Sequence, residues 1–259
     1  MKRKHGDTGG DFDFSGAALS RHWKELHEGD REPWPDDPLV QKAWRAFHTG
    51  DFAEAVEQGS GLGAAGAVVA NKAAAVETLY MKRDAAKVLR ILQAAVTRGE
   101  RAAHELPDHA NSHYTLALVL GRYSQRISIL KALADGLAGK VRSHLERTLE
   151  LEPHHAEAHV ALGLYHAEII NKLGSLAAGL TYGASAEKAL EHFRRACRLA
   201  PASPIVQLEH AHGLILLDAS RHRAEAHKLY ERVASLEPRD AMEAQDIAYA
   251  RDNLAELQA

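Results

Sequence analysis

The chain has 259 residues, of which 46 % are hydrophobic, so it can bury a core in one elongated domain or two small ones. Its formal net charge of −3 excludes the clustered excess of Lys and Arg that marks a nucleic-acid surface. The single cysteine excludes a disulfide framework within the chain. No run of about 18 apolar residues occurs, and the basic start lacks the apolar stretch of a signal peptide. We therefore expect a cytoplasmic protein without a membrane span.

Residues 1–36 are rich in Gly, Asp, Pro and charged side chains, which predicts a mostly flexible N-terminal extension. One short helix is expected over residues 15–28, and the prolines that follow it prevent a longer one. Trp23 and Trp34 could attach this extension to the rest of the chain. The helical pattern then begins, which places a helical repeat domain at residues 37–259.

Four prolines punctuate the repeat domain, and each closes an amphipathic helix that is followed by a fresh helical run. They are Pro107, Pro153, Pro201 and Pro238, separated by 46, 48 and 37 residues. Self-similarity at such a period predicts stacked pairs of helices. The last spacing is close to the tetratricopeptide period of about 34 residues, so the two longer spacings indicate insertions.

Small and aromatic residues recur at fixed positions before these prolines. They are Ala189, Phe193 and Ala196 before Pro201, and Ala226 and Tyr230 before Pro238. A small residue lets two helices approach closely, and an aromatic ring fills the gap to the next pair. In this pattern the chain resembles the tetratricopeptide superfamily over about residues 38–257. The resemblance implies an all-α right-handed superhelix of about five helix pairs. A terminal helix over residues 240–257 would cap its open end.

Two long apolar insertions separate the helices of consecutive pairs, at residues 127–137 and 169–180. Around the second insertion the chain reads LG-x-YHAEI, then TYGAS and EKALEHF. With these features it resembles the regulator of microtubule dynamics family and its bacterial relatives over about residues 110–257. That resemblance implies a non-enzymatic interaction protein. A second resemblance, to helical-repeat accessory components of tripartite solute transporters, implies a small-molecule binder instead.

Three local motifs invite a chemical interpretation, and the sequence favours a structural one for each. Residues 61–66 spell G-x-G-x-x-G, but a dinucleotide site needs a preceding strand and this stretch follows a helix. His155 and His159 have i, i+4 spacing, but the Glu of the H-E-x-x-H metalloprotease motif is absent. Cys197 has no histidine on its own helix face to activate it. We therefore predict no catalytic residue, no cofactor and no metal. Buried histidines would make the fold sensitive to acid.

The predicted binding site is the concave face, which the first helix of each pair lines in tetratricopeptide proteins. The residues at those positions are Asn111, Tyr114, Leu118, Glu157, Val160, Leu164, Ile205, Leu208 and His212. They form a mostly apolar groove, and such an exposed patch indicates a protein or peptide partner. The apolar insertions could equally fold back and fill the groove.

The leading hypothesis is a non-enzymatic scaffold that binds a partner segment in this groove. One alternative is a small-molecule binder whose cavity the two insertions close. The other is a homo-oligomer in which the insertions form the subunit contact.

Overall fold

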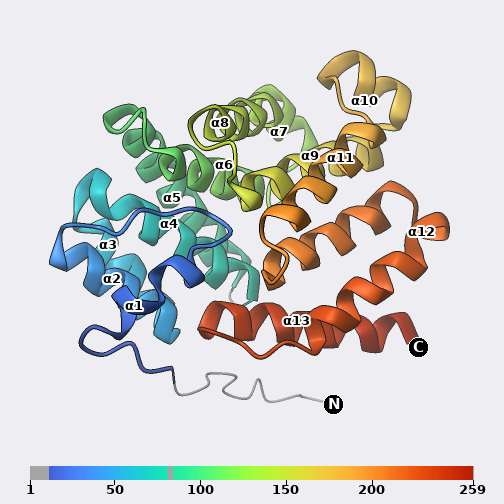
Figure 1. Ribbon diagram of the computed structural model, residues 1–259. Helices are drawn as coiled ribbons and strands as arrows, with labels where there is room; N and C mark the ends of the chain where they lie inside the picture. The colour runs from blue at the N-terminus through green and yellow to red at the C-terminus, as the bar shows by residue number, and fades with distance from the viewer. Residues whose placement is uncertain (1–11, 81–83, 259) are drawn as a thin grey trace.

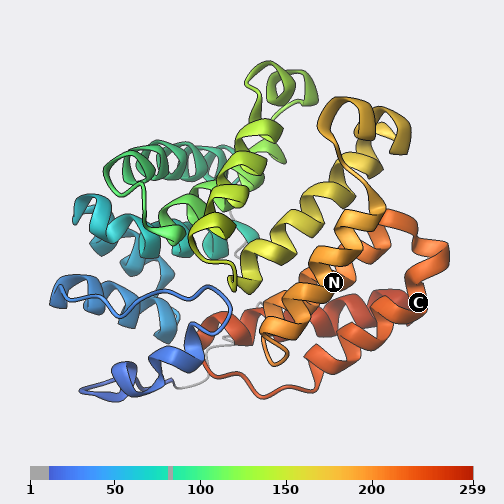
Figure 2. The ribbon, with the colours of Figure 1, turned by 45° about the horizontal axis from the view of Figure 1, so that its top comes forward.

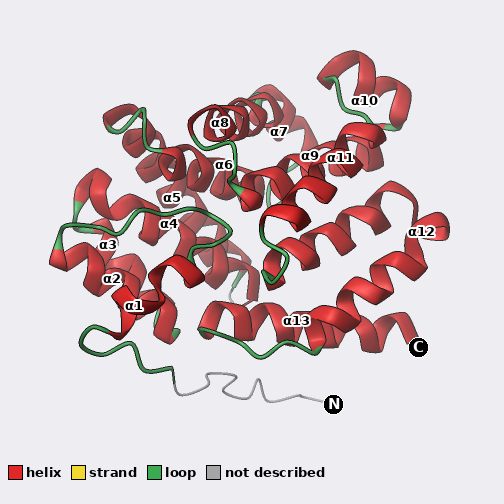
Figure 3. Ribbon diagram, in the orientation of Figure 1, coloured by secondary structure: helices red, strands yellow, loops and turns green. Residues whose placement is uncertain are grey.

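The computed structural model describes residues 12–80 and 84–258, and within those ranges the protein contains helices and no strands (Figure 3). The helices are α1 (Ala18–Leu26), α2 (Pro38–Thr49), α3 (Phe52–Ser60), α4 (Gly63–Tyr80), α5 (Ala85–Glu105), α6 (Ala110–Ser124), α7 (Ile129–Ala134), α8 (Leu137–Leu151), α9 (Ala156–Leu173), α10 (Ser175–Tyr182), α11 (Ala186–Leu199), α12 (Pro204–Ala234) and α13 (Ala241–Gln258).

The helices pack as successive pairs: α2 with α3, α4 with α5, α6 with α8, and α9 with α11. Helix α12 supplies a fifth pair by itself, because Asp218 has extended backbone angles that bend the helix there. The pairs stack into a curved superhelix, and α13 packs on α12 (Figures 1 and 2). The prediction of an all-α repeat superhelix is confirmed.

The turns between pairs are built alike, which shows the repeat at the level of atoms. The helix N-cap lies two residues after the proline in three successive turns, at His109, His155 and Ser203. The side chain six residues after the proline hydrogen-bonds to the proline carbonyl. These contacts are His113 Nε2–Pro107 O at 2.9 Å, His159 Nε2–Pro153 O at 3.2 Å and Gln207 Nε2–Pro201 O at 2.8 Å. Each contact fixes the direction in which the chain enters the next pair.

The small and aromatic positions pack as the repeat pattern predicts. Ala189 and Phe193 on α11 are fully buried in one core cluster with Val160 of α9. Ala226 and Tyr230 take the equivalent places in the next pair and pack in a cluster with residues of α13. These contacts bury the interior faces of consecutive pairs against each other.

The two insertions form the short helices α7 and α10, which project from the same edge of the superhelix (Figures 1 and 2). Arg142 Nη1 on α8 donates to the carbonyl of Tyr182 at the end of α10, at 3.1 Å. This bond connects the two pairs that carry the insertions.

Residues 12–36 pack against the first helices. Leu19 and Trp23 on α1 are buried with Trp44 of α2, and Trp23 Nε1 donates to the carbonyl of Glu32 at 2.8 Å. Trp34 makes an edge contact with Trp23. The expected attachment by the tryptophans is present, whereas a mostly flexible extension does not describe these residues. Their aromatic side chains bury enough surface to offset the polar composition. Residues 1–11 lie outside the described residues, and a domain boundary at residue 36 stays a prediction.

The terminal helix also contacts the beginning of the chain. His48 Nδ1 on α2 lies 2.6 Å from Oδ2 of Asp240, the residue before α13, and both side chains are buried. Ala241 joins the core cluster of α2 and α3. Arg251 and Asp252 are exposed, as expected for a capping helix. Helix α13 therefore joins the last pair to the first one and does more than cover an open end.

Candidate functional site

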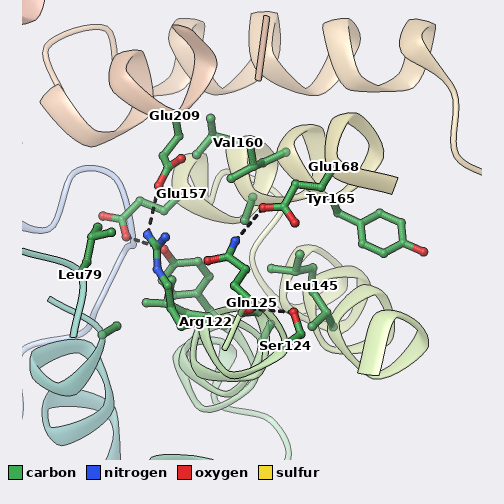
Figure 4. Close-up of a pocket in the computed structure, with 18 of the residues that line it drawn as sticks. Leu79, Arg122, Ser124, Gln125, Leu145, Glu157, Val160, Tyr165, Glu168 and Glu209 are labelled. Carbon is green, nitrogen blue, oxygen red and sulfur yellow. Dashed lines mark hydrogen bonds and ion pairs between the residues drawn. The ribbon is translucent and has the colours of Figure 1, made fainter. Parts of the chain in front are cut away.

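A cavity of about 210 Å³ lies on the inner side of the superhelix, lined mainly by the first helices of successive pairs. Figure 4 shows it between α6, α8 and α9, with Glu209 of α12 above it. Its walls are largely apolar, with leucine and valine side chains from α6, α8 and α9. Six residues predicted for the groove line this cavity: Tyr114, Leu118, Glu157, Val160, Leu164 and Ile205.

The other three predicted residues do not line it. Asn111 is buried, and its side chain bonds to the carbonyl of Asp30 and to Nε2 of His155. Leu208 is buried in the last core cluster. His212 lies with its Nδ1 3.6 Å from a carboxylate oxygen of Glu209. The repeat register identifies the helices that line the cavity. It does not distinguish positions on the cavity wall from positions in the core.

The insertions line the cavity without filling it. Ala132 of α7 and Leu137 at the start of α8 contribute to one wall, and Leu173 and Tyr182 contribute to another. The fold therefore keeps an apolar space on its concave side and extends its walls with the two insertions. An apolar cavity of this size can take a small apolar molecule or a few apolar side chains.

A polar cluster closes one end of the cavity, where four helices meet. Arg122 Nη2 on α6 donates to Oε1 of Glu209 on α12 at 3.2 Å (Figure 4), and Tyr80 of α4 donates to Asp246 of α13. Two atoms of the cluster are buried without a hydrogen-bond partner: Nε of Arg122 and Oδ2 of Asp246. Unpaired buried polar atoms are rare in folded proteins, so this end of the cavity has unused bonding capacity.

Burial sets the protonation of this cluster. It raises the pKa of Asp246 well above its usual range, and the hydrogen bond from Tyr80 does not offset the effect. Burial also opposes ionisation of Glu209, but the contacts with His212 and Arg122 lower the pKa of that carboxyl. The cluster therefore combines a carboxyl whose protonated form is favoured by burial with an ion pair.

A second polar group borders the cavity around Lys72, a buried lysine in the middle of α4. Its Nζ contacts a carboxylate oxygen of Asp30 and lies 3.2 Å from Oε1 of Glu157. Tyr114 donates to the other oxygen of Glu157 at 2.9 Å. Burial would lower the pKa of Lys72, but the two carboxylates raise it. The ammonium is therefore charged and fully paired, which suits a positioning role better than proton transfer.

Sequence reasoning missed Lys72, Asp30, Arg122 and Asp246. Lys72 did offer a signal, because it is the single charge in the run AVVANKAAAV, where a lysine has to find a partner. Its partner Asp30 lies 42 residues earlier, and no local pattern connects the two.

The local motifs have structural roles. A Cβ added to Gly66 would come within 2.2 Å of the carbonyl oxygen of Gly59, so the G-x-G-x-x-G stretch lets α3 and α4 cross closely. Cys197 lies 3.4 Å from Nδ1 of His210, and burial raises its pKa, which disfavours the nucleophilic thiolate. Among the described residues no three His, Cys, Asp or Glu side chains converge on a common point that could hold a metal ion.

Comparisons with known proteins assign the architecture to a family. The family model described as regulator of microtubule dynamics protein 1-3 matches residues 65–258. No curated protein matches the chain. In the part of the chain that the structure describes, none of the helices has the length and hydropathy to span a membrane.

Proposed function

Because the chain belongs to the regulator of microtubule dynamics family, we propose that it is a non-enzymatic scaffold of the tetratricopeptide type. It acts in the cytoplasm and holds an apolar segment of a partner protein in its concave cavity. The main support is the cavity itself, whose walls combine predicted groove residues with both insertions.

The side chains that line the cavity indicate which kind of partner segment fits it. Leu118 and Leu164 are partly buried side chains that face the cavity from α6 and α9. They require apolar side chains opposite them, because a charged group there would lose its hydration without gaining an ion pair. An amphipathic helix that offers two or three apolar residues fits this wall.

Exchange of cavity side chains tests the proposal. Leu118→Asn combined with Leu164→Asn keeps the side-chain size but places amides on the apolar wall. We expect a purified partner to lose at least tenfold in affinity for this variant, because truncating apolar anchors typically weakens binding by about 1.4 kcal/mol or more. Leu39→Asn is the matched control, since Leu39 is exposed on α2 and does not line the cavity. Equal binding by all three proteins would refute the proposal.

A second candidate occupant is a small apolar molecule with one polar group. The unpaired Arg122 Nε and Asp246 Oδ2 favour it, because a bound oxygen atom at that end of the cavity could satisfy both. Native mass spectrometry of the gently purified protein would show the added mass. If the polar group of the molecule binds at Asp246, the Asp246→Leu variant should lack the added mass. The same added mass in this variant would exclude binding of the polar group at Asp246.

A further inference from the structure

The concave face also carries a polar binding site that the chain's own residues 27–32 occupy. The backbone N–H of Glu157, in the first turn of α9, donates to the carbonyl of Gly29 at 3.0 Å. Asn111 Nδ2 on α6 donates to the carbonyl of Asp30 at 2.8 Å. The Asp30 carboxylate pairs with Lys72 on α4. Three successive repeats therefore hold one short turn through two backbone carbonyls and one carboxylate.

Two of the three residues that hold this turn were expected to hold a partner. Asn111 and Glu157 stand at the same repeat position, four residues after Pro107 and Pro153, and both were predicted for the groove. Two backbone carbonyls and one side-chain anion make few demands on sequence beyond the aspartate. Any peptide that can place an aspartate in such a turn meets the same contacts.

The turn fits its site imperfectly. Arg31 adopts a left-handed conformation with φ of 54°, which is unfavourable for a residue other than glycine. Glu32 is buried with Oε2 lacking a hydrogen-bond partner, and burial raises its pKa to about 8. Asp30 and Glu157 contact the ammonium group of Lys72, whereas Glu32 makes no ion pair with it, and the charge of Asp30 disfavours ionisation of Glu32. A segment without the second acidic residue would avoid part of this conflict.

We propose that this is a recognition site for an aspartate-bearing turn, that residues 27–32 fill it as an intramolecular ligand, and that an acidic partner segment displaces them. The site borders the apolar cavity through Lys72 and Glu157 but binds a different chemical group. Displacement of residues 27–32 would therefore give a partner a second contact on the concave face. This contact does not depend on what occupies the apolar cavity.

The test uses the full chain and a fluorescently labelled peptide of residues 26–34, LHEGDREPW. Asp30→Ala removes the anion of the internal turn but leaves Lys72 its second partner, Glu157. This variant should bind the peptide at least tenfold more tightly than the wild-type chain, because its internal turn has lost its charged contact with Lys72 and is displaced more easily. The same peptide carrying Asp30→Asn should not bind, and Asn111→Leu added to the variant should abolish binding. Asp36→Ala, at an exposed position, should behave as wild type.

A second variant controls for the case in which Asp30→Ala does not fold. Gly29→Val displaces the turn by sterics, because even a Cβ at this position would lie 3.0 Å from Oε1 of Glu157. Failure of a variant with wild-type helicity to bind the peptide would overturn the proposal.

Hydrogen exchange on the wild-type chain needs no variant. A large excess of peptide should accelerate exchange of the amides of residues 30–32, and an unchanged rate would also overturn it. Leu118→Asn with Leu164→Asn should leave peptide binding intact, which separates this site from the cavity.

Discussion

The ring of Phe193 on α11 packs directly against the backbone of Gly213 on α12, so that a Cβ at Gly213 would lie 2.1 Å from Cζ of the ring. Phe193 is fully buried, and the neighbouring Cδ1–Cε1 edge of its ring meets Gly163 of α9 in the same way. Two glycines thus form the space into which the aromatic residue of the repeat fits. Close packing of three helices at one ring leaves no room for an additional methyl group.

Gly213→Ala should therefore destabilise the fold, although alanine is the better helix former. Overpacking a core costs about 1–3 kcal/mol, which exceeds the gain of about 1 kcal/mol in helix propensity. Urea unfolding followed by circular dichroism measures the difference. Gly139→Ala is the control, because Gly139 lies exposed in α8 with no heavy atom near its Cβ position, and this change should stabilise. Equal effects of the two substitutions would refute the packing argument.

Acid should destabilise the protein through its buried histidines. Burial lowers the pKa of His155 to about 3, and burial lowers the pKa of His27 and His166 to about 4. In the unfolded chain these groups bind protons below about pH 6.5. The unfolded state therefore takes up more protons between about pH 6.5 and the folded pKa values, and stability falls as the pH falls through that range.

His155→Asn isolates one contribution to this pH dependence. Asparagine can replace the ring as helix N-cap, a role in which His155 Nδ1 accepts from the N–H of Ala158 at 3.0 Å. The variant should lose less stability than wild type between about pH 7 and about pH 5, since one titrating group is gone. An identical pH dependence of the urea midpoint would show that His155 is not held neutral.

Lys72→Met should be strongly destabilising because it leaves Asp30 and Glu157 buried without their cation. Breaking a buried ion pair from one side typically costs about 3–5 kcal/mol. Lys87→Met, at an exposed position of α5, should change stability by less than about 0.5 kcal/mol. Adding Asp30→Asn and Glu157→Gln to Lys72→Met should restore part of the loss. No recovery would mean that the ion pairs are not the source of the effect.

The exposed apolar surface of α10 is the candidate subunit contact if the protein forms a homo-oligomer. Leu176 and Leu180 are 79 % and 82 % exposed, one helical turn apart, and the helix carries no charged residue. If this surface joins two copies, light scattering should give a dimer mass that Leu176→Ser with Leu180→Ser returns to the monomer. A monomer at every concentration of the wild-type chain would exclude α10 as a subunit contact.

The fold followed from the sequence because its repeat signals are local. A proline two residues before the N-caps of α6, α9 and α12, and alanine and aromatic residues at fixed positions, specify where helices end and how pairs pack. The structure brings Tyr114, Val160 and Leu164, three residues predicted for the groove, to the wall of one cavity. These three residues lie on the first helices, and the repeat register alone decides the face they share.

The polar groups could not be derived in this way. Asp30 and Lys72 pair across 42 residues, and Tyr80 and Asp246 pair across 166. Such contacts depend on the curvature of the whole superhelix, which no helix encodes by itself. The acidic composition around Asp30 is typical of a solvated extension. The one signal in the sequence for a buried anion is Lys72, which lies in an otherwise apolar helix and needs a partner of opposite charge.

Photo-crosslinking from the cavity wall shows directly whether a partner segment occupies the cavity. A photoreactive phenylalanine analogue is placed at position 164, facing the cavity, and at position 39, exposed on α2, and each protein is irradiated with its copurified partner. We expect a covalent adduct from position 164 that maps to an apolar segment of one partner, with none from position 39. Adducts of equal yield from both positions, or none from position 164, would contradict it.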